Sequence, residues 1–251
     1  MSVTSTQKKA EEAAFWDKIA HQRIYAAFDQ EEYSSFIDTT LGVDLTGMTV
    51  LDVGSAAGVT AALFAARGAM VHGIDISPDL IAQSKKLWPE YAERLNFRVG
   101  DAENLDLPDN SVDACFFGGV LHHFQEREQV CAEAFRVLKP GGRLIAVEPN
   151  RLDFFELIEW AVADLRGKLS PNEYPIDPRE MKREMIAAGF NPVRFWPVRR
   201  DIPVLAQIPG VKRAFNRQKG FWMKRPLLRF VNAWRAPEKR GTFFVIDGRK
   251  P

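Results

Sequence analysis

The chain has 251 residues, of which 46% are hydrophobic and 27% charged, and its formal net charge is +1 at pH 7. This length allows one large α/β domain or two small ones, and the composition is ordinary for a soluble protein. Two cysteines, Cys115 and Cys131, are too few for a disulfide framework, and they lack metal-ligand neighbours, so no metal site is expected.

The N-terminal region is polar and predicts helices rather than a signal segment. It has no apolar core of a signal peptide, and no run of 18 apolar residues occurs in the chain, so we expect a cytoplasmic protein. Apolar and aromatic residues between Glu11 and Phe36 follow mostly helical spacing, which predicts one or two amphipathic helices before the sheet. His21 and Tyr25 share a helix face, which makes them candidates for a lid over a pocket, with plain packing as the alternative.

The stretch from Thr49 to Ser77 predicts a strand, a glycine turn, a helix and a second strand. Its first apolar run, interrupted by Asp52, is typical of a strand buried in a parallel sheet. Gly54 and Gly58 follow and bracket small residues, so the backbone can turn tightly and a ligand can approach it. The second strand ends in Asp75, 21 positions after Gly54 (75 minus 54), where an acid of a βαβ unit can accept hydrogen bonds from ribose hydroxyls.

The glycine spacing helps to decide which nucleoside is bound. The dinucleotide fingerprint needs a close second glycine, but Ala56 stands at that position, and no P-loop lysine follows. The turn D-x-G-x-x-x-G instead resembles that of class I S-adenosylmethionine (SAM) dependent methyltransferases. A glycine-rich turn in an unrelated α/β protein is the alternative for this stretch taken alone.

Two later strands end in residues suited to the same ligand. A strand at residues 96–99 precedes Asp101 and Ala102, and the strand after it runs into Gly118 and Gly119. Because the carboxyl ends of parallel strands share the edge where open α/β sheets bind ligands, these residues should lie near the first glycine turn. The remaining predicted elements are helices at 60–66, 78–87, 129–138, 152–165 and 178–188 and strands at 111–117, 143–148, 192–198 and 241–247.

With the segment LKPGGRLIAVEPN, these stretches resemble the small-molecule branch of class I SAM methyltransferases, which includes the ubiquinone and menaquinone biosynthesis enzymes. The resemblance runs from Val50 to Asn150. It implies a Rossmann-like, doubly wound sheet of seven mostly parallel strands with the last one antiparallel, and methylation of oxygen or carbon in a small-molecule acceptor with release of S-adenosylhomocysteine. It implies SAM contacts at Asp52, Gly54, Ser55, Ala56, Gly58, Asp75, Ile76, Asp101, Ala102, Gly118 and Gly119, with Asp101 accepting from the adenine amino group.

Histidine is the natural general base where the acceptor is a hydroxyl. His122 and His123 follow the fourth strand and His21 lies in the predicted cap, and at most one of them is expected to act as the base. The family tetrapeptide of amine and base methyltransferases after strand four is absent, since the sequence there reads GGVL. We therefore expect no nucleic-acid partner. The two cysteines do not form a group of the kind that an arsenite methyltransferase needs.

The last part of the chain is basic. Residues 194–251 hold 15 Lys and Arg against three acids, a net charge of +12, and the predicted insert 199–240 alternates basic with apolar and aromatic residues. A basic lid over the pocket is the favoured interpretation. The alternative is that this segment contacts an anionic membrane, as in a membrane-associated methyltransferase of a lipid or quinone intermediate. For the function of the whole protein, a second alternative is a SAM-binding protein with chemistry other than methyl transfer. The expected organisation is a single domain with an N-terminal helical cap (1–40), a SAM-binding core (41–150), a helix, loop and sixth-strand region (151–198), a helical insert (199–240) and a last strand with its tail (241–251).

Overall fold

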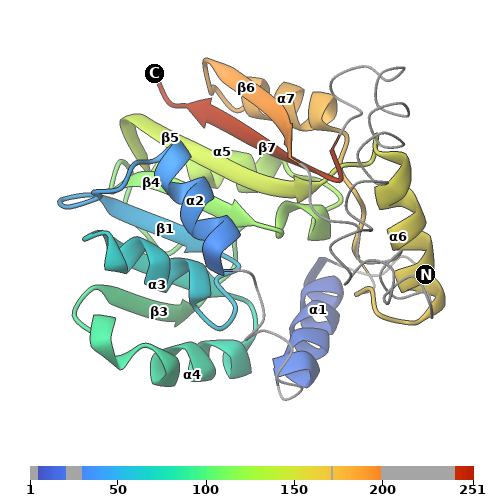
Figure 1. The fold of residues 1–251 in the computed structure, drawn as a ribbon, viewed down its shortest axis with the longest axis horizontal. Helices are drawn as coiled ribbons and strands as arrows, with labels where there is room; N and C mark the ends of the chain where they lie inside the picture. Colours follow the sequence, from blue (N-terminus) through green and yellow to red (C-terminus); the bar gives the residue numbers. More distant parts are fainter. Residues whose placement is uncertain (1–4, 21–29, 171, 199–240) are drawn as a thin grey trace, which may run out of the picture.

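The structure is a computed structural model, and it describes residues 5–20, 30–170, 172–198 and 241–251. Its strands are β1 (Thr49–Val53), β2 (Met70–Asp75), β3 (Leu95–Val99), β4 (Val112–Gly118), β5 (Leu138–Pro149), β6 (Val193–Val198) and β7 (Phe243–Arg249). They form one sheet in the order β3-β2-β1-β4-β5-β7-β6 (Figure 1). β7 runs antiparallel to β5 and β6, and the other neighbours are parallel. The predicted α/β class, strand number and antiparallel last strand are confirmed.

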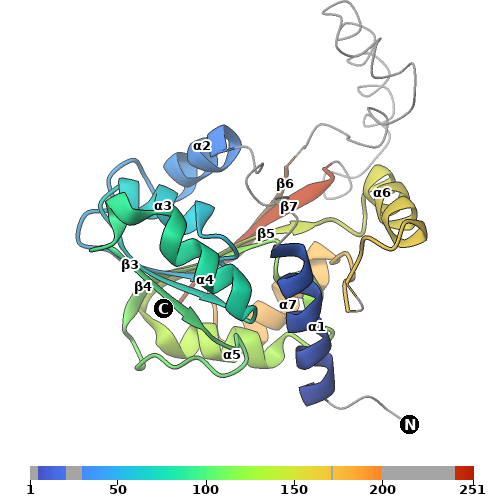
Figure 2. The same cartoon turned by 90° about the horizontal axis from the view of Figure 1, so that it is seen from below.

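Helices cover both faces of this sheet, as in a doubly wound fold. The helices are α1 (Ser5–Ala20), α2 (Gln30–Thr40), α3 (Val59–Ala66), α4 (Pro78–Leu87), α5 (Glu128–Val137), α6 (Phe154–Leu165) and α7 (Pro178–Ala187), with single 3-10 turns η2 (Pro89–Tyr91) and η3 (Leu121–His123). Figure 2 shows α2, α3 and α4 on one face and α5 and α7 on the other, while α1 and α6 lie beyond one edge. Among the described residues, no helix is both long and apolar enough to cross a bilayer. The predicted insert 199–240 lies outside these residues.

The core has two halves because successive residues of the central strands point to opposite faces. On β4, Phe116 packs with Phe64 of α3, whereas Phe117 packs with the cluster that contains Val130 of α5 and Met181 of α7. All five side chains are at most 1% exposed. Burial on both faces explains why the strands appear in the sequence as apolar runs without alternation.

The start of β5 differs from the prediction. The sequence predicts a helix over 129–138 and a strand only from 143, but the strand begins at Leu138, directly after α5. The register of β4 against β5 shifts after Val112 pairs with Leu138, and Gly141 and Gly142 exchange backbone hydrogen bonds with Lys250. A strand partner more than 100 residues later therefore orders a segment whose local sequence indicates a turn.

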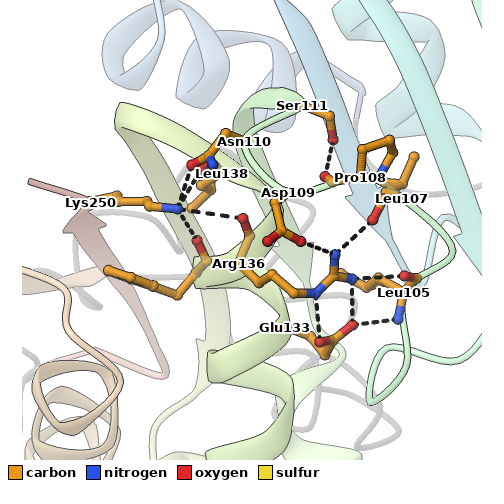
Figure 3. A network of polar contacts seen from close by, with 11 residues as sticks. Leu105, Leu107, Pro108, Asp109, Asn110, Ser111, Glu133, Arg136, Leu138 and Lys250 are labelled. Carbon is orange, nitrogen blue, oxygen red and sulfur yellow. Dashed lines mark hydrogen bonds and ion pairs between the residues drawn. The ribbon is translucent and has the colours of Figure 1, made fainter.

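Two basic side chains secure the end of α5 (Figure 3). Arg136 donates to the carbonyl oxygens of Leu105 and Leu107 at 2.9 and 2.8 Å and pairs with Glu133 of its own helix. Lys250 donates to the carbonyl oxygens of Phe135 and Leu138, each at 2.7 Å. Cations near the carboxyl end of a helix interact favourably with its dipole and satisfy its last carbonyls. These contacts join the chain end to the segment before β4.

Candidate active site

A cavity of about 710 Å³ lies at the carboxyl ends of the parallel strands, between α1 and α6. This volume is within the usual range of ligand pockets, about 300 to 1,000 Å³. The walls come from the turns after β1, β2, β3 and β4, together with side chains of α1 and α6. The residues implied as SAM contacts that line this cavity are Gly54, Ser55, Ala56, Asp75, Ile76, Asp101, Ala102, Gly118 and Gly119.

Asp52 and Gly58, the other two residues implied as SAM contacts, do not line the cavity. Asp52 is only 2% exposed, and burial, followed by the charge of Asp75, raises the pKa of Asp52 to about 8. Gly58 has φ of +83°, and a Cβ there would lie 2.5 Å from the ring of Phe97. Both residues therefore lie beneath the glycine turn and support it rather than line the cavity.

The first glycine turn is shaped by its neighbours across the sheet edge. Gly54 has φ of +66°, and a Cβ there would lie 2.1 Å from Cγ2 of Val120, so only glycine lets the segment after β4 pack so closely. Ser55 is 5% exposed, and its hydroxyl has no hydrogen-bond partner in the described part of the chain. Because Ser55 lines the cavity, a polar atom of a ligand can satisfy this buried hydroxyl.

Asp75 links the end of β2 to the glycine turn. Its Oδ2 accepts a hydrogen bond from the N–H of Ala56 at 2.9 Å, and its Oδ1 accepts from the N–H of Ser77 at 2.9 Å. Burial raises the pKa of the Asp75 carboxyl, and these two N–H groups oppose that effect. Each carboxylate oxygen has a second lone pair, so the acid can hold the turn and still accept from a ligand.

Asp101 is held from α1, which the sequence did not predict. Lys9 lies 2.5 Å from Oδ2 of Asp101 and also contacts the carboxylate of Glu103. The second oxygen of Asp101 accepts from the N–H of Glu103 at 2.9 Å. α1 is also joined to the start of α4, where Asp17 contacts the hydroxyl of Ser77 at 2.5 Å. Polar contacts thus fasten α1 over the mouth of the cavity.

His122 and His123, hereafter the histidine pair, lie on η3 and line the same cavity. Their ring centroids are 4.2 Å apart. Nδ1 of His122 lies 2.8 Å from Oε2 of Glu148, whose side chain is completely buried at the end of β5. Trp160 of α6 meets the ring of His122 edge to face. Glu148 could not be singled out from the sequence, because nothing local indicates that its side chain reaches the histidine.

His123 has a separate carboxylate partner on α1. Its Nδ1 lies 2.9 Å from Oε1 of Glu12 and 3.2 Å from the hydroxyl of Ser170. Burial would raise the pKa of Glu12, but the hydrogen bond and charge of His123, with further hydrogen bonds from Ser170 and Trp16, lower it. Each histidine is therefore fixed by its own acid. His21 and Tyr25, the other candidates, lie outside the described residues.

The central part of the chain matches a known family. Residues 51–146 match the model described as a methyltransferase domain. This region of the chain is similar to that family. This match covers β1 through most of β5 and therefore the turns that form one side of the cavity.

Curated relatives have related names. A probable S-adenosylmethionine-dependent methyltransferase of Mycolicibacterium smegmatis is 35% identical over 108 residues, 43% of this chain and 40% of the relative. An arsenite methyltransferase of Halobacterium salinarum is 34% identical, and the matched region covers 82% of this chain and 47% of the relative. A demethylmenaquinone methyltransferase of Renibacterium salmoninarum is 28% identical, and the matched region covers 68% of this chain and 76% of the relative. The chain spans about half or less of the length of the first curated relatives it matches.

Solved structures share the fold of this chain. A SAM-dependent methyltransferase of Thermotoga maritima, described as a possible histamine N-methyltransferase, has a TM-score of 0.61 at 18% identity, with 96% of both chains covered. The cyclase SpnF has a TM-score of 0.58 at 20% identity, with 88% of this chain and 80% of SpnF covered. At such identities the likeness shows the fold.

The segments around the cavity also bring possible cation ligands together. One ligand atom each from His122, His123 and Glu173 lie within 4.8 Å of one another, a cluster the sequence analysis did not foresee. Within this cluster Nδ1 of His123 lies 3.9 Å from Oε1 of Glu173, and Nδ1 of each histidine also faces its own carboxylate, Glu148 or Glu12.

Proposed function

We propose that the chain is a SAM-dependent methyltransferase that methylates an oxygen or carbon of a small-molecule acceptor. The observation that carries this proposal is the shared cavity, where nine residues implied as cofactor contacts meet the histidine pair. The similarity to the methyltransferase domain family and the names of the curated relatives support the same activity.

The residues around the cavity fit this cofactor. The buried hydroxyl of Ser55 lacks a protein partner among the described residues, Asp75 retains lone pairs for ribose hydroxyls, and Gly118 and Gly119 leave backbone exposed beside the cavity. When bound, SAM supplies a methyl group to the electron pair of the acceptor, and its carbon–sulfur bond breaks to leave S-adenosylhomocysteine. The protein contributes mainly alignment to such a displacement, because the two reacting atoms must be in line.

The far side of the cavity is suited to an acceptor with a ring. Trp16 and Trp160 stand edge to face against His123 and His122, and Phe243 of β7 adds a further aromatic wall. These side chains give the far side an aromatic surface next to the histidine pair, which can take a proton from a hydroxyl or an acidic C–H. A quinone-like acceptor, as in the name of the demethylmenaquinone relative, agrees with this lining.

Arsenite is a poor fit as acceptor, although one relative bears that name. The chain has two cysteines, and both are completely buried in the core. Burial raises the pKa of Cys131 to about 12 and raises that of Cys115 further above its ordinary value. Thiolates bind arsenic(III), so protonated core thiols that do not line the cavity cannot supply such a site.

Calorimetry with SAM and S-adenosylhomocysteine tests the cofactor site. We expect saturable binding of both, and Asp75→Ala should weaken it about 10- to 100-fold, because hydrogen bonds to a charged group contribute about 1.5–3 kcal/mol. The matched control is Asp106→Ala, since the Asp106 side chain is fully exposed at the surface. Absence of SAM binding to the wild-type chain would refute the proposal.

Transfer is measured with methyl-labelled SAM and a panel of a naphthoquinol, a simple phenol, an aliphatic alcohol and a primary amine. The proposal predicts labelled naphthoquinol or phenol with one S-adenosylhomocysteine per product. The chain shares its fold with the cyclase SpnF, which supports a second candidate function, a SAM-binding enzyme with chemistry other than methyl transfer. For such an enzyme, product would form without S-adenosylhomocysteine. For the basic segment 199–240, co-sedimentation with anionic liposomes at physiological salt would favour the membrane-associated alternative over a lid.

A further inference from the structure

We propose that Glu148 is a positioning residue that fixes the tautomer of His122 and thereby makes His122, rather than His123, the general base. This inference rests on the methyl transfer proposed above. The tests below separate its failure from a failure of that function.

Glu148 is surrounded by hydrogen-bond donors. Its Oε1 accepts from the N–H of Val120 at 3.0 Å and from the N–H of Leu121 at 2.8 Å, while its Oε2 faces Nδ1 of His122 at 2.8 Å. The side chain is 0% exposed, so water does not compete for these contacts. Two backbone N–H groups and one ring nitrogen therefore hold this buried carboxylate in one orientation.

This arrangement determines where the proton of His122 resides. An ionised carboxylate can only accept, so Nδ1 must carry hydrogen in both the neutral and the charged ring. The neutral ring has one N–H, and Nε2 therefore keeps its lone pair. Because His122 lines the cavity just after Gly118 and Gly119, this lone pair is available for a proton of the acceptor. The negative charge of Glu148 then stabilises the imidazolium that forms.

His123 has a similar carboxylate partner but a less rigid support. Glu12 belongs to α1, and α1 contacts the core through side chains such as Lys9 and Asp17. Glu148 belongs to β5, and its own carboxylate is bonded to the backbone that carries His122. Alignment with a methyl group tolerates errors of only about 0.5 Å, which favours the base attached to the sheet.

The decisive variant is Glu148→Gln, which keeps the size of the side chain. Both backbone N–H groups contact Oε1, so the amide oxygen of glutamine should occupy that position. Its NH₂ group must then face Nδ1 of His122 and donate to it. The variant should reverse the tautomer, with hydrogen on Nε2 and no lone pair toward the acceptor.

Long-range ¹H–¹⁵N spectra of protein labelled at histidine report the tautomer directly. The chain has four histidines, so the His122 signals can be assigned by one substitution. In the wild type we expect the Nδ1–H form of His122, and in Glu148→Gln the Nε2–H form. Turnover of the panel member that the wild type methylates should fall about 100-fold or more, while affinity for S-adenosylhomocysteine stays within about threefold.

Two variants serve as controls. Glu12→Gln makes the same chemical change beside His123, and it should leave the His122 tautomer unchanged and cost turnover far less than Glu148→Gln. His122→Asn keeps an N–H donor to Glu148 but has no base. Adding Glu148→Gln to His122→Asn should cause little further loss, because the two residues act through one interaction.

The outcomes are separable. An Nε2–H tautomer of His122 in the wild type would overturn the inference without any variant, even if Glu148→Gln fails to fold. A reversed tautomer with unchanged turnover would do the same. If the wild type binds neither SAM nor S-adenosylhomocysteine and methylates no acceptor, the proposed function fails instead, whatever the tautomer.

Discussion

Replacing the buried Asp52 by asparagine should change how the stability of the protein depends on pH. The Asp52 carboxyl is 2% exposed, its Oδ2 has no hydrogen-bond partner in the described segments, and its pKa is raised from 3.8 to about 8. Burial is the main cause and the charge of Asp75 the second. The native protein therefore keeps a proton on Asp52 at pH values where the unfolded chain has released it.

The sign and size follow from proton linkage. Between about pH 4 and pH 8 the native state binds one more proton at this site than the unfolded state, so stability falls as pH rises. The slope is about 1.4 kcal/mol per pH unit, and from pH 5 to pH 7 the loss is about 3 kcal/mol. Asparagine does not titrate. The unfolding free energy of Asp52→Asn relative to wild type should therefore rise by about that amount over this range.

Guanidinium denaturation followed by tryptophan fluorescence at pH 5, 6, 7 and 8 measures this difference, since the chain has six tryptophans. Titrating groups that do not interact with Asp52 contribute to both proteins and largely cancel in the comparison. Asp106→Asn is the matched control, because that exposed side chain should show a flat difference. A difference between Asp52→Asn and wild type that stays constant from pH 5 to pH 7 would refute the buried, protonated carboxyl.

Three further results are expected. Gly54→Ala should lower the unfolding free energy by about 2–4 kcal/mol in urea denaturation. The alanine would have to adopt a φ of +66°, and its methyl group would lie 2.1 Å from Val120. A loss below about 1 kcal/mol would contradict this packing. Ser77→Ala should cost about 1–2 kcal/mol, because its hydroxyl caps α4 and contacts Asp17 of α1, whereas Ser111→Ala at an exposed site should be nearly neutral. In calorimetric titration with Zn²⁺, wild type and His123→Asn should give the same weak heats, because Nδ1 of His122 and Nδ1 of His123 already face the carboxylates of Glu148 and Glu12 at 2.8 and 2.9 Å. Tight binding that is lost in the variant would reveal a metal site.

Local signals were sufficient for the sheet and for one side of the cavity. The apolar runs of β1, β2 and β4 predict buried parallel strands, and Ser77 followed by Pro78 predicts the start of α4, where the serine hydroxyl accepts from the N–H of Leu80 at 3.1 Å. Parallel strands present their carboxyl ends at one edge, so the residues that follow them were expected to meet. That expectation depends on strand order alone.

Other features needed the tertiary structure because they join residues distant in sequence. The start of β5 is ordered by the chain end at Lys250, although its own glycines indicate a turn. Lys9 reaches Asp101 across 92 positions, and Glu148 reaches His122 across 26. A spacing in sequence carries no information on such side-chain contacts.

The α/β fold, the edge where the ligand site forms and the resemblance to SAM methyltransferases follow from strand periodicity, glycine turns and the order of parallel strands, all of which can be recognised in the amino-acid sequence. The positions of Asp52 and Gly58 beneath the turn, and the separate carboxylate that faces each histidine, became known from the folded structure. The physical reason is that burial and hydrogen bonding of a side chain depend on what packs against it from other elements. Those neighbours are brought together only when the sheet and α1 are assembled.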